Sequence, residues 1–182
     1  MYKCFRLVYL LILFASNVLY GQSTTNDSIP KQRTVFRINL AGVGVGAELP
    51  IFPKLSTYLE AGMGYNLQFV EEQGKTRLRS DIFPFFRAQA RYYYSRNKRI
   101  AKGKDVDKFT GEFLSITTSY LSDTKNKENV IGIGGGFGFQ SHFKKRGFVG
   151  FLIGPGVAWQ SRGEIWQLRV YLNTWLGLGF AF

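Results

Sequence analysis

The chain has 182 residues, enough for one ordinary domain, and 24 Lys and Arg against 12 Asp and Glu give it a formal net charge of +12. Its 45% hydrophobic and 16% aromatic residues, with 21 glycines and five prolines, exclude a disordered or collagen-like chain and indicate many strands. A single cysteine, Cys4, and a single histidine, His142, argue against disulfides, cysteine-based metal sites and most histidine-dependent catalytic sites. We therefore expect no cofactor, metal or catalytic residue.

Residues 1–21 are predicted to be a cleaved signal peptide. Two basic residues precede an apolar run over residues 7–15, which is too short to cross a bilayer as a helix because that takes about 20 residues. An N-terminal membrane anchor is the alternative. Cleavage would remove Lys3 and Arg6 and lower the net charge from +12 to +10. Residues 22–32 are polar and show no pattern, so we interpret them as a flexible tail.

From residue 33 onward, large apolar residues alternate with small or polar ones, which is the pattern of β-strands. The alternation over residues 166–182 is longer than an ordinary soluble strand of about 3–10 residues. A change of phase at residues 41–42 indicates a tight turn or a bulge. The even strand number of bacterial barrels favours the turn, with one bulged strand as the alternative. The predicted strands are residues 33–41, 42–49, 56–69, 82–94, 114–120, 131–143, 148–159 and 166–182.

The two faces of these strands favour a membrane barrel over a soluble sandwich. Leu168, Val170 and Leu172 lie on a face of large apolar side chains, whereas the opposite faces of the strands are mainly glycine or polar. A soluble sandwich rarely fills its solvent side with glycine, while a membrane barrel turns large apolar groups to lipid and keeps a narrow interior small or hydrogen-bonded. We predict one all-β domain over residues 33–182: an eight-stranded antiparallel up-and-down transmembrane β-barrel.

Placing both termini in the periplasm assigns every turn to one side of the membrane. Predicted extracellular connections are residues 41–42, 70–80, 122–129 and 161–164, and predicted periplasmic ones are residues 50–55, 96–110 and 144–147. Membrane interfaces are enriched in aromatic residues, and this count places aromatic residues at both rims. They are Phe69, Tyr120, Trp159 and Trp166 at the outer rim, and Tyr92, Tyr94, Phe143, Phe180 and Phe182 at the inner rim.

The last six residues resemble the assembly signal of outer-membrane β-barrel proteins, because Phe182 is terminal and Phe180 precedes it by two positions. Residues 44–50 and 91–94 are similar to segments of small OmpA/OmpX-like barrels. The resemblance implies the outer membrane of a Gram-negative bacterium, contact with lipopolysaccharide and insertion by the barrel assembly machinery. Gly177, Phe180 and Phe182 would form the assembly signal. It implies no particular activity, since such barrels include adhesins, enzymes and scaffolds.

The inward parity is predicted to collect charged side chains of both signs. Buried charges must be paired, so we expect a salt-bridge network that fills a lumen too narrow for a channel, with a proton or ion path as the alternative. The residues are Arg37, Glu48, Glu60, Arg87, Arg91, Glu112 and Arg169.

The connection over residues 96–108 is strongly basic. It is interpreted as a solvated loop near anionic headgroups, or as a docking site for a periplasmic partner that would make the chain a subunit of a larger envelope complex. Export argues against nucleic acid as the partner. The candidate docking residues are Arg96, Lys98, Arg99, Lys102, Lys104 and Lys108.

Two further motifs are expected to carry no chemistry. Residues 42–47 fit a dinucleotide fingerprint, but prolines follow where that motif needs a helix. Ser141 and His142 invite comparison with lipid A deacylase barrels, but adjacent residues of a strand point to opposite faces. We expect a non-enzymatic membrane scaffold or small binding or interaction protein, with a lipid A-modifying barrel enzyme as the alternative.

Overall fold

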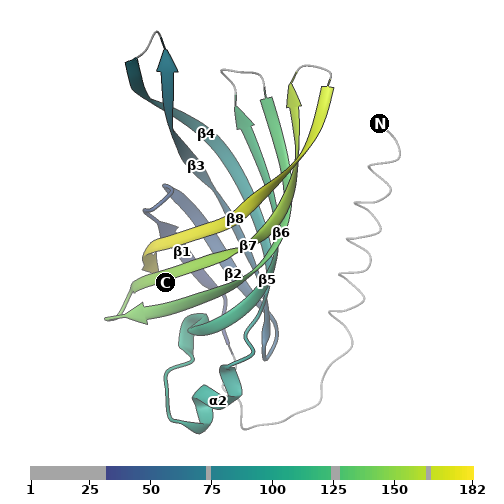
Figure 1. The fold of residues 1–182 in the computed structure, drawn as a ribbon. Coiled ribbons are helices and arrows are strands. Elements are labelled where there is room, and N and C mark those ends of the chain that lie inside the picture. The colour runs from purple at the N-terminus through teal and green to yellow at the C-terminus, as the bar shows by residue number, and fades with distance from the viewer. Residues whose placement is uncertain (1–31, 73–74, 124–127, 163–164) are drawn as a thin grey trace. The chain divides into compact units, whose positions relative to one another are not determined.

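The computed structural model describes residues 32–182 apart from residues 73–74, 124–127 and 163–164. The predicted signal peptide and residues 22–31 of the predicted tail lie outside the described residues. Eight antiparallel strands form a closed barrel, in which each strand pairs with its neighbours along the chain and β1 pairs with β8 (Figure 1). The predicted all-β, eight-stranded, up-and-down architecture is therefore confirmed.

The barrel has two ends, which we name the α2 end and the far end. Helices α2 (Arg96–Ala101) and η1 (Asp107–Phe109) lie at the α2 end, between β4 and β5. Among the described residues, no helix is long and apolar enough to cross a lipid bilayer. The strands are β1 (Val35–Asn39), β2 (Gly44–Phe52), β3 (Leu55–Glu72), β4 (Lys75–Tyr92), β5 (Gly111–Asp123), β6 (Glu128–Phe143), β7 (Gly147–Arg162) and β8 (Ile165–Ala181).

The structure settles two of the sequence-based strand boundaries. Residues 40–43 form a turn, so the predicted division into two strands is correct and the single bulged strand is wrong. The predicted connection over residues 70–80 is also wrong, because β3 and β4 remain paired as far as Glu72 and Lys75. The apolar alternation ends before this pairing does. Two paired strands can form backbone hydrogen bonds without a buried apolar face, so the pairing can extend beyond the alternation.

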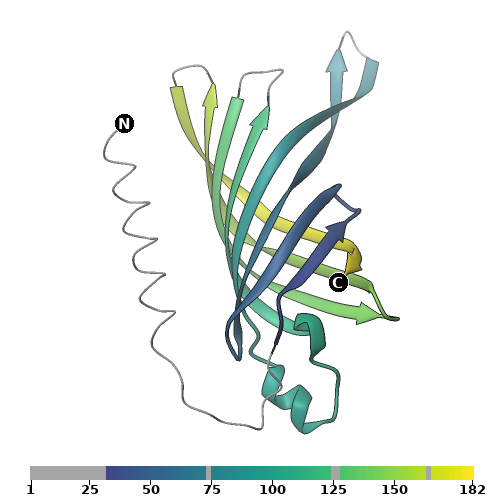
Figure 2. The same cartoon turned by 180° about the vertical axis from the view of Figure 1, so that it is seen from behind.

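One side of the barrel wall is low. β1 pairs with β8 only from Arg37–Ala181 to Asn39–Gly179, whereas β7 pairs with β8 along its whole length. The β2–β3 register likewise stops at Gly44–Gly62, far short of the end of β3. Figure 2 shows the short β1–β2 hairpin beside the taller strands. Beyond the turn of this hairpin, β8 and β3 continue without β1 and β2 between them. We name this shorter part of the barrel wall the low side.

Large apolar side chains cover the outer face of all eight strands. Val170, Ile116 and Leu168 are 82%, 68% and 62% exposed, and the aromatic residues predicted for the inner rim are exposed as well. Tyr120, Trp159 and Trp166 are exposed near the far end, while the side chain of Phe69 lies outside the described part of the chain. The fully buried side chains include charged and amide residues from the opposite parity, so the apolar surface faces outward and the polar one inward.

Glycines on the inner face make room for the large aromatic side chains of β8. A Cβ atom added at Gly150 would lie 2.8 Å from the ring of Trp175, and one added at Gly177 would lie 2.6 Å from the same ring. A Cβ at Gly132 would lie 2.8 Å from the hydroxyl of Tyr171. The glycine rows are therefore explained by close packing inside the barrel.

Candidate functional site

The α2 half of the barrel interior holds a buried ion-pair group, which we name the charge cluster: Arg37, Glu48 and Arg91. Nη1 of Arg37 lies 2.6 Å from Oε2 of Glu48, and Nη1 of Arg91 lies 3.3 Å from the same oxygen. Ser56 and Tyr93 donate hydrogen bonds of 2.5 and 2.7 Å to the other oxygen. All three charged side chains are inaccessible to solvent. Both oxygens of this carboxylate are thus fully engaged.

Arg91 is enclosed by aromatic rings as well as by hydrogen-bond acceptors. Its guanidinium carbon lies 4.1 Å from the ring centre of Tyr58, 4.6 Å from that of Trp175 and 4.7 Å from that of Phe113. Gln89 and Gln140 accept further hydrogen bonds from it, at 2.7 and 3.0 Å. Cation–π contacts of this kind partly replace lost hydration. The charge cluster is therefore a packed core with no room for a ligand.

A second ion pair lies next to the charge cluster, toward the middle of the barrel. Oε2 of Glu60 receives Nη1 of Arg87 at 3.3 Å and the indole N–H of Trp175 at 3.0 Å. Its other oxygen accepts a 2.8 Å hydrogen bond from Asn39. Arg87 keeps 21% of its side chain exposed, whereas that of Glu60 is inaccessible. Arg87 consequently marks the boundary between the packed interior and accessible space.

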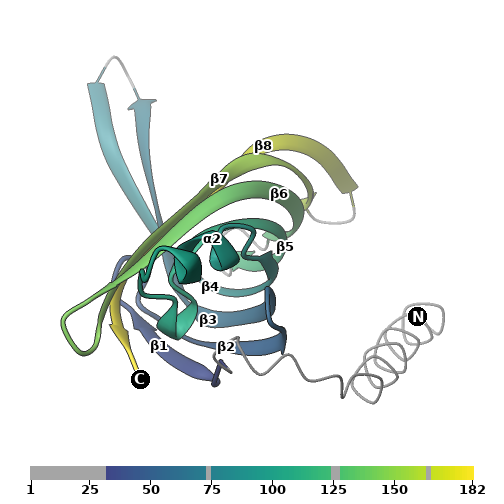
Figure 3. The same cartoon turned by 90° about the horizontal axis from the view of Figure 1, so that it is seen from below.

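Residues 93–110, which we name the closing segment, lie across the α2 end (Figure 3). Phe109 is fully buried and packs on Tyr93, with ring centres 5.8 Å apart. The backbone carbonyl of Lys108 accepts hydrogen bonds from Arg37 at 3.1 Å and from Gln140 at 3.3 Å. The ammonium of Lys108 donates to the carbonyls of residues 145 and 181 at 2.9 and 3.0 Å. The segment is therefore fastened both to the barrel interior and to its rim.

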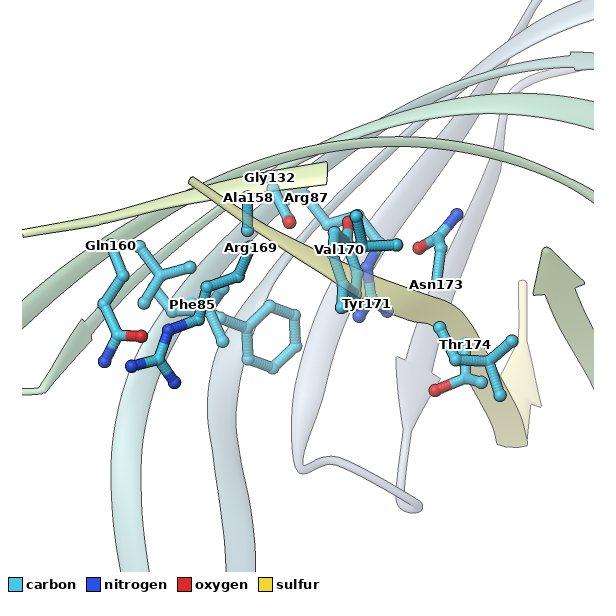
Figure 4. Close-up of a pocket in the computed structure, with 14 residues that line it drawn as sticks. Phe85, Arg87, Gly132, Ala158, Gln160, Arg169, Val170, Tyr171, Asn173 and Thr174 are labelled. Atoms are coloured by element: carbon cyan, nitrogen blue, oxygen red, sulfur yellow. The ribbon is translucent and has the colours of Figure 1, made fainter. Parts of the chain in front are cut away.

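The far half of the interior contains a cavity of about 500 Å³, which we name the inner cavity (Figure 4). Its polar lining includes Arg87, Arg169, Tyr171 and Asn173, and its apolar lining comes from all five strands from β4 to β8. Arg169 is exposed, and it donates a 3.4 Å hydrogen bond to the side chain of Gln167. The volume falls within the range of about 300–1,000 Å³ that is usual for small-molecule sites.

Comparisons with family models, with curated proteins and with solved structures found no match to this chain. The resemblance to small OmpA/OmpX-like barrels therefore stays a prediction. The function is therefore inferred from the geometry of the barrel itself.

The structure divides the predicted lumen network into three parts. Arg37, Glu48 and Arg91 meet in the charge cluster, Glu60 meets Arg87, and Arg169 lies apart on the inner cavity. Glu112 does not belong to the lumen, and its prediction is wrong. It shares the outward parity of Leu114, which is 53% exposed, and it lies near the basic residues of the closing segment.

The neutral partners of the charge cluster were not predicted from the sequence. They are chiefly the three aromatic rings and the two glutamines around Arg91. Their inward parity was readable, but the partners come from strands that only the closed ring brings together. The missed residues are Ser56, Tyr58, Gln89, Tyr93, Phe113, Gln140 and Trp175.

The predicted docking residues differ in what the fold leaves exposed. Arg96 is buried, burial lowers the pKa of its guanidinium, and the nearby Asp107 carboxylate opposes that shift. Arg99 donates two hydrogen bonds to the carbonyl of residue 105, at 3.1 and 2.9 Å. Lys98, Lys102 and Lys104 are exposed around a shallow hollow that also includes Tyr94, Arg99 and Glu112.

The predicted assembly-signal residues lie at the end of β8. Phe180 and Phe182 are exposed on the outer face, and the guanidinium of Arg146 lies 5.2 Å from the ring centre of Phe182. Gly177 lies on the inner face against Trp175.

His142 points to the closing segment. Its Nδ1 lies 2.9 Å from the hydroxyl of Thr110, and its ring packs on Phe148 with centres 6.3 Å apart. Ser141 occupies the opposite strand parity. Among the described residues, no group of three or more acidic, histidine or cysteine side chains could hold a metal ion.

Proposed function

We propose that this chain is an integral outer-membrane β-barrel that acts as a small, non-enzymatic binding protein, with a membrane scaffold as the simpler version. The proposal depends on one observation: large apolar side chains are exposed around the whole barrel while charged side chains are buried inside it. Such an outer face is stable in contact with lipid hydrocarbon, because exposing this much apolar surface to water is unfavourable. The predicted signal peptide agrees with export.

In this proposal the α2 end faces the periplasm and the far end faces outward. Both exposed aromatic groups then lie at the two membrane interfaces. The closing segment blocks the periplasmic end, so a through-channel is not part of the proposal. The accessible chemistry is the inner cavity, which is why binding is favoured over a purely structural role.

The first experiment tests membrane insertion by cell fractionation and by gel mobility with and without boiling. We expect an outer-membrane protein whose unboiled form migrates differently, because an intact barrel resists unfolding by detergent. Recovery in the soluble periplasmic fraction would overturn the proposal.

Leu172→Arg is the matching variant, since Leu172 is 61% exposed on the outer face. An arginine in the middle of the lipid-facing belt costs about 2–4 kcal/mol, so we expect assembly to fall sharply. Leu172→Phe, which keeps the position apolar, is the control. Equal assembly of the two variants would mean that this face does not contact lipid.

Orientation is tested by labelling introduced cysteines with a membrane-impermeant maleimide. Ile165→Cys at the far end should react in intact cells, and Lys102→Cys at the α2 end should react only after the outer membrane is permeabilised. The reverse pattern would invert the proposed topology.

The lipid A-modifying alternative predicts that lipid A from a deletion strain has a changed acyl pattern in mass spectrometry. An unchanged pattern is expected here, because Ser141 and His142 lie on opposite strand faces and His142 is engaged with Thr110 at the end assigned to the periplasm. A changed pattern that plasmid-borne protein restores would favour the enzyme.

A further inference from the structure

The polar wall of the inner cavity presents hydrogen-bond donors without acceptors. Asn173 is only 3% exposed, yet its side-chain Nδ2 has no hydrogen-bond partner among the described residues. The same holds for Nε of Arg87 and for the hydroxyl of Tyr171. An unmet buried donor costs about 1–3 kcal/mol, so this arrangement suits a ligand that brings an acceptor.

The charge around these donors favours an anion. Two arginines, Arg87 and Arg169, line the inner cavity, and no acidic residue is among the lining residues whose side chains the structure describes. The one carboxylate bound to Arg87, that of Glu60, belongs to the packed interior and is inaccessible. In Figure 4 the guanidinium of Arg169 lies apart, beside Gln160 and Phe85, whereas the side chains of Arg87, Tyr171 and Asn173 lie close together. A carboxylate or phosphate oxygen would meet several donors there.

The rest of the lining is apolar and continues to the outside of the barrel. Phe85, Leu121 and Val130 line the inner cavity from β4, β5 and β6. Six consecutive residues of β8, 169–174, line it as well, although successive residues belong to opposite faces of a strand. Both faces can contribute only where the cavity runs along the edge of the strand. That edge borders the low side, where β1 no longer covers β8.

We propose that the inner cavity binds an anionic amphiphile, an acyl chain with a carboxylate or phosphate head group. The head group lies on Arg87, Tyr171 and Asn173, with the charge of Arg169 farther along the same cavity, and the chain lies along Phe85 and Leu121 and out over the edge of β8. The sideways route from the bilayer rests on the proposed function, whereas binding itself does not. The packed interior closes the cavity below, so the molecule is held rather than passed through.

The three tryptophans of the chain provide the assay. Trp159 and Trp166 are exposed on the outer face, whereas Trp175 is buried and is the next inward residue of β8 after Asn173. In the Trp159→Phe/Trp166→Phe background, fluorescence reports on Trp175 alone. Dibromostearate, its methyl ester and a brominated lysophosphatidic acid are titrated into the purified full barrel in a detergent with an uncharged head group.

Saturable quenching by dibromostearate or by the brominated lysophosphatidic acid is expected, with the methyl ester at least about tenfold weaker. The tighter of the two acids identifies the head group as carboxylate or phosphate. Asn173→Asp should weaken binding by at least about tenfold by placing a carboxylate opposite the ligand, and Arg169→Gln, which removes a positive charge from the same cavity, should weaken it less. Arg33→Gln removes an exposed charge before β1 and serves as the control. Since Arg169 is exposed, its variant is expected to fold normally.

Three results would overturn the inference: no quenching of Trp175, equal binding of acid and ester, or equal affinity of Asn173→Asp and the control. Boiled and unboiled gel mobility of the same samples shows whether the barrel is intact. An intact, membrane-inserted barrel that binds no probe would remove the ligand and leave the proposed function standing. Binding by a barrel that is recovered in the soluble fraction would support the ligand and overturn the proposed function.

Discussion

The two halves of the barrel interior give an inward-facing arginine different surroundings. In the α2 half, Arg91 meets one carboxylate, two glutamines and three aromatic rings, and it is fully buried. In the far half, Arg169 is exposed beside a cavity and donates a hydrogen bond to Gln167. Both residues come from the inward parity of their strands. The difference shows that inward charge alone does not identify a functional site; what matters is whether the fold has already supplied the partners.

The largest expected contrast comes from removing charge in each half. Glu48→Gln leaves the buried Arg37 and Arg91 without a counter-charge, and breaking a buried pair in this way costs about 3–5 kcal/mol. Arg169→Gln, at an exposed position, should change the free energy of unfolding by about 0.5 kcal/mol or less. Urea unfolding of the detergent-folded barrel measures both values. Similar values would mean that the two halves do not differ as described.

A smaller contrast concerns packing against glycine. Gly150→Ala in the α2 half pushes a methyl group into the ring of Trp175, which is held by Glu60 and Tyr58, and should cost about 1–3 kcal/mol. Gly132→Ala in the far half meets the hydroxyl ends of Ser119 and Tyr171, which can turn into the inner cavity. We expect a change below about 0.5 kcal/mol there. Equal losses in urea unfolding would show that the far half is packed as tightly as the other.

The closing segment offers a more local test. Thr110→Val removes the hydrogen bonds to His142 and to the carbonyl of Asp107, at a cost of about 1 kcal/mol. Amide hydrogen exchange should rise within residues 93–110 and stay unchanged in β7 and β8. Faster exchange throughout the barrel would mean that the segment supports the whole α2 half.

The smallest effect on stability is expected at the exposed lysines of the closing segment. Lys102→Gln and Lys104→Gln should leave unfolding within about 0.5 kcal/mol of the parent chain. If this surface docks a periplasmic partner, a crosslinker placed at Lys102 or Lys104 should trap it in cells, and the same crosslinker at Ile165 should not. Crosslinking that captures no periplasmic protein would count against the envelope-complex alternative.

Strand number and strand faces were predictable from the sequence because both depend on a period of two. Leu168 and Leu172 showed the outward face before any partner was known. The misplacement of Glu112 was avoidable, since it precedes the outward Leu114 by two positions. The long β3–β4 pairing was missed because its outer part has no apolar alternation.

The two halves of the interior could not be told apart from the sequence. Arg91 is enclosed because β3, β5 and β8 bring Tyr58, Phe113 and Trp175 around it, and this depends on the register of strands that are distant in the chain. The inner cavity depends on how early β1 ends relative to β8. No local pattern encodes either property.

The joint between β1 and β8 has a consequence for how the ring comes together. Its partners are about 140 positions apart along the chain, whereas the pairs within each hairpin are near neighbours, so it is expected to form last. Before that step, β1 to β8 would be a curved open sheet whose two free edges are β1 and β8. Lys108, from the middle of the chain, then fastens the final rung through the carbonyl of Ala181. The closing segment, a loop at one end of the barrel, would thus hold β1 and β8 together and keep the barrel closed.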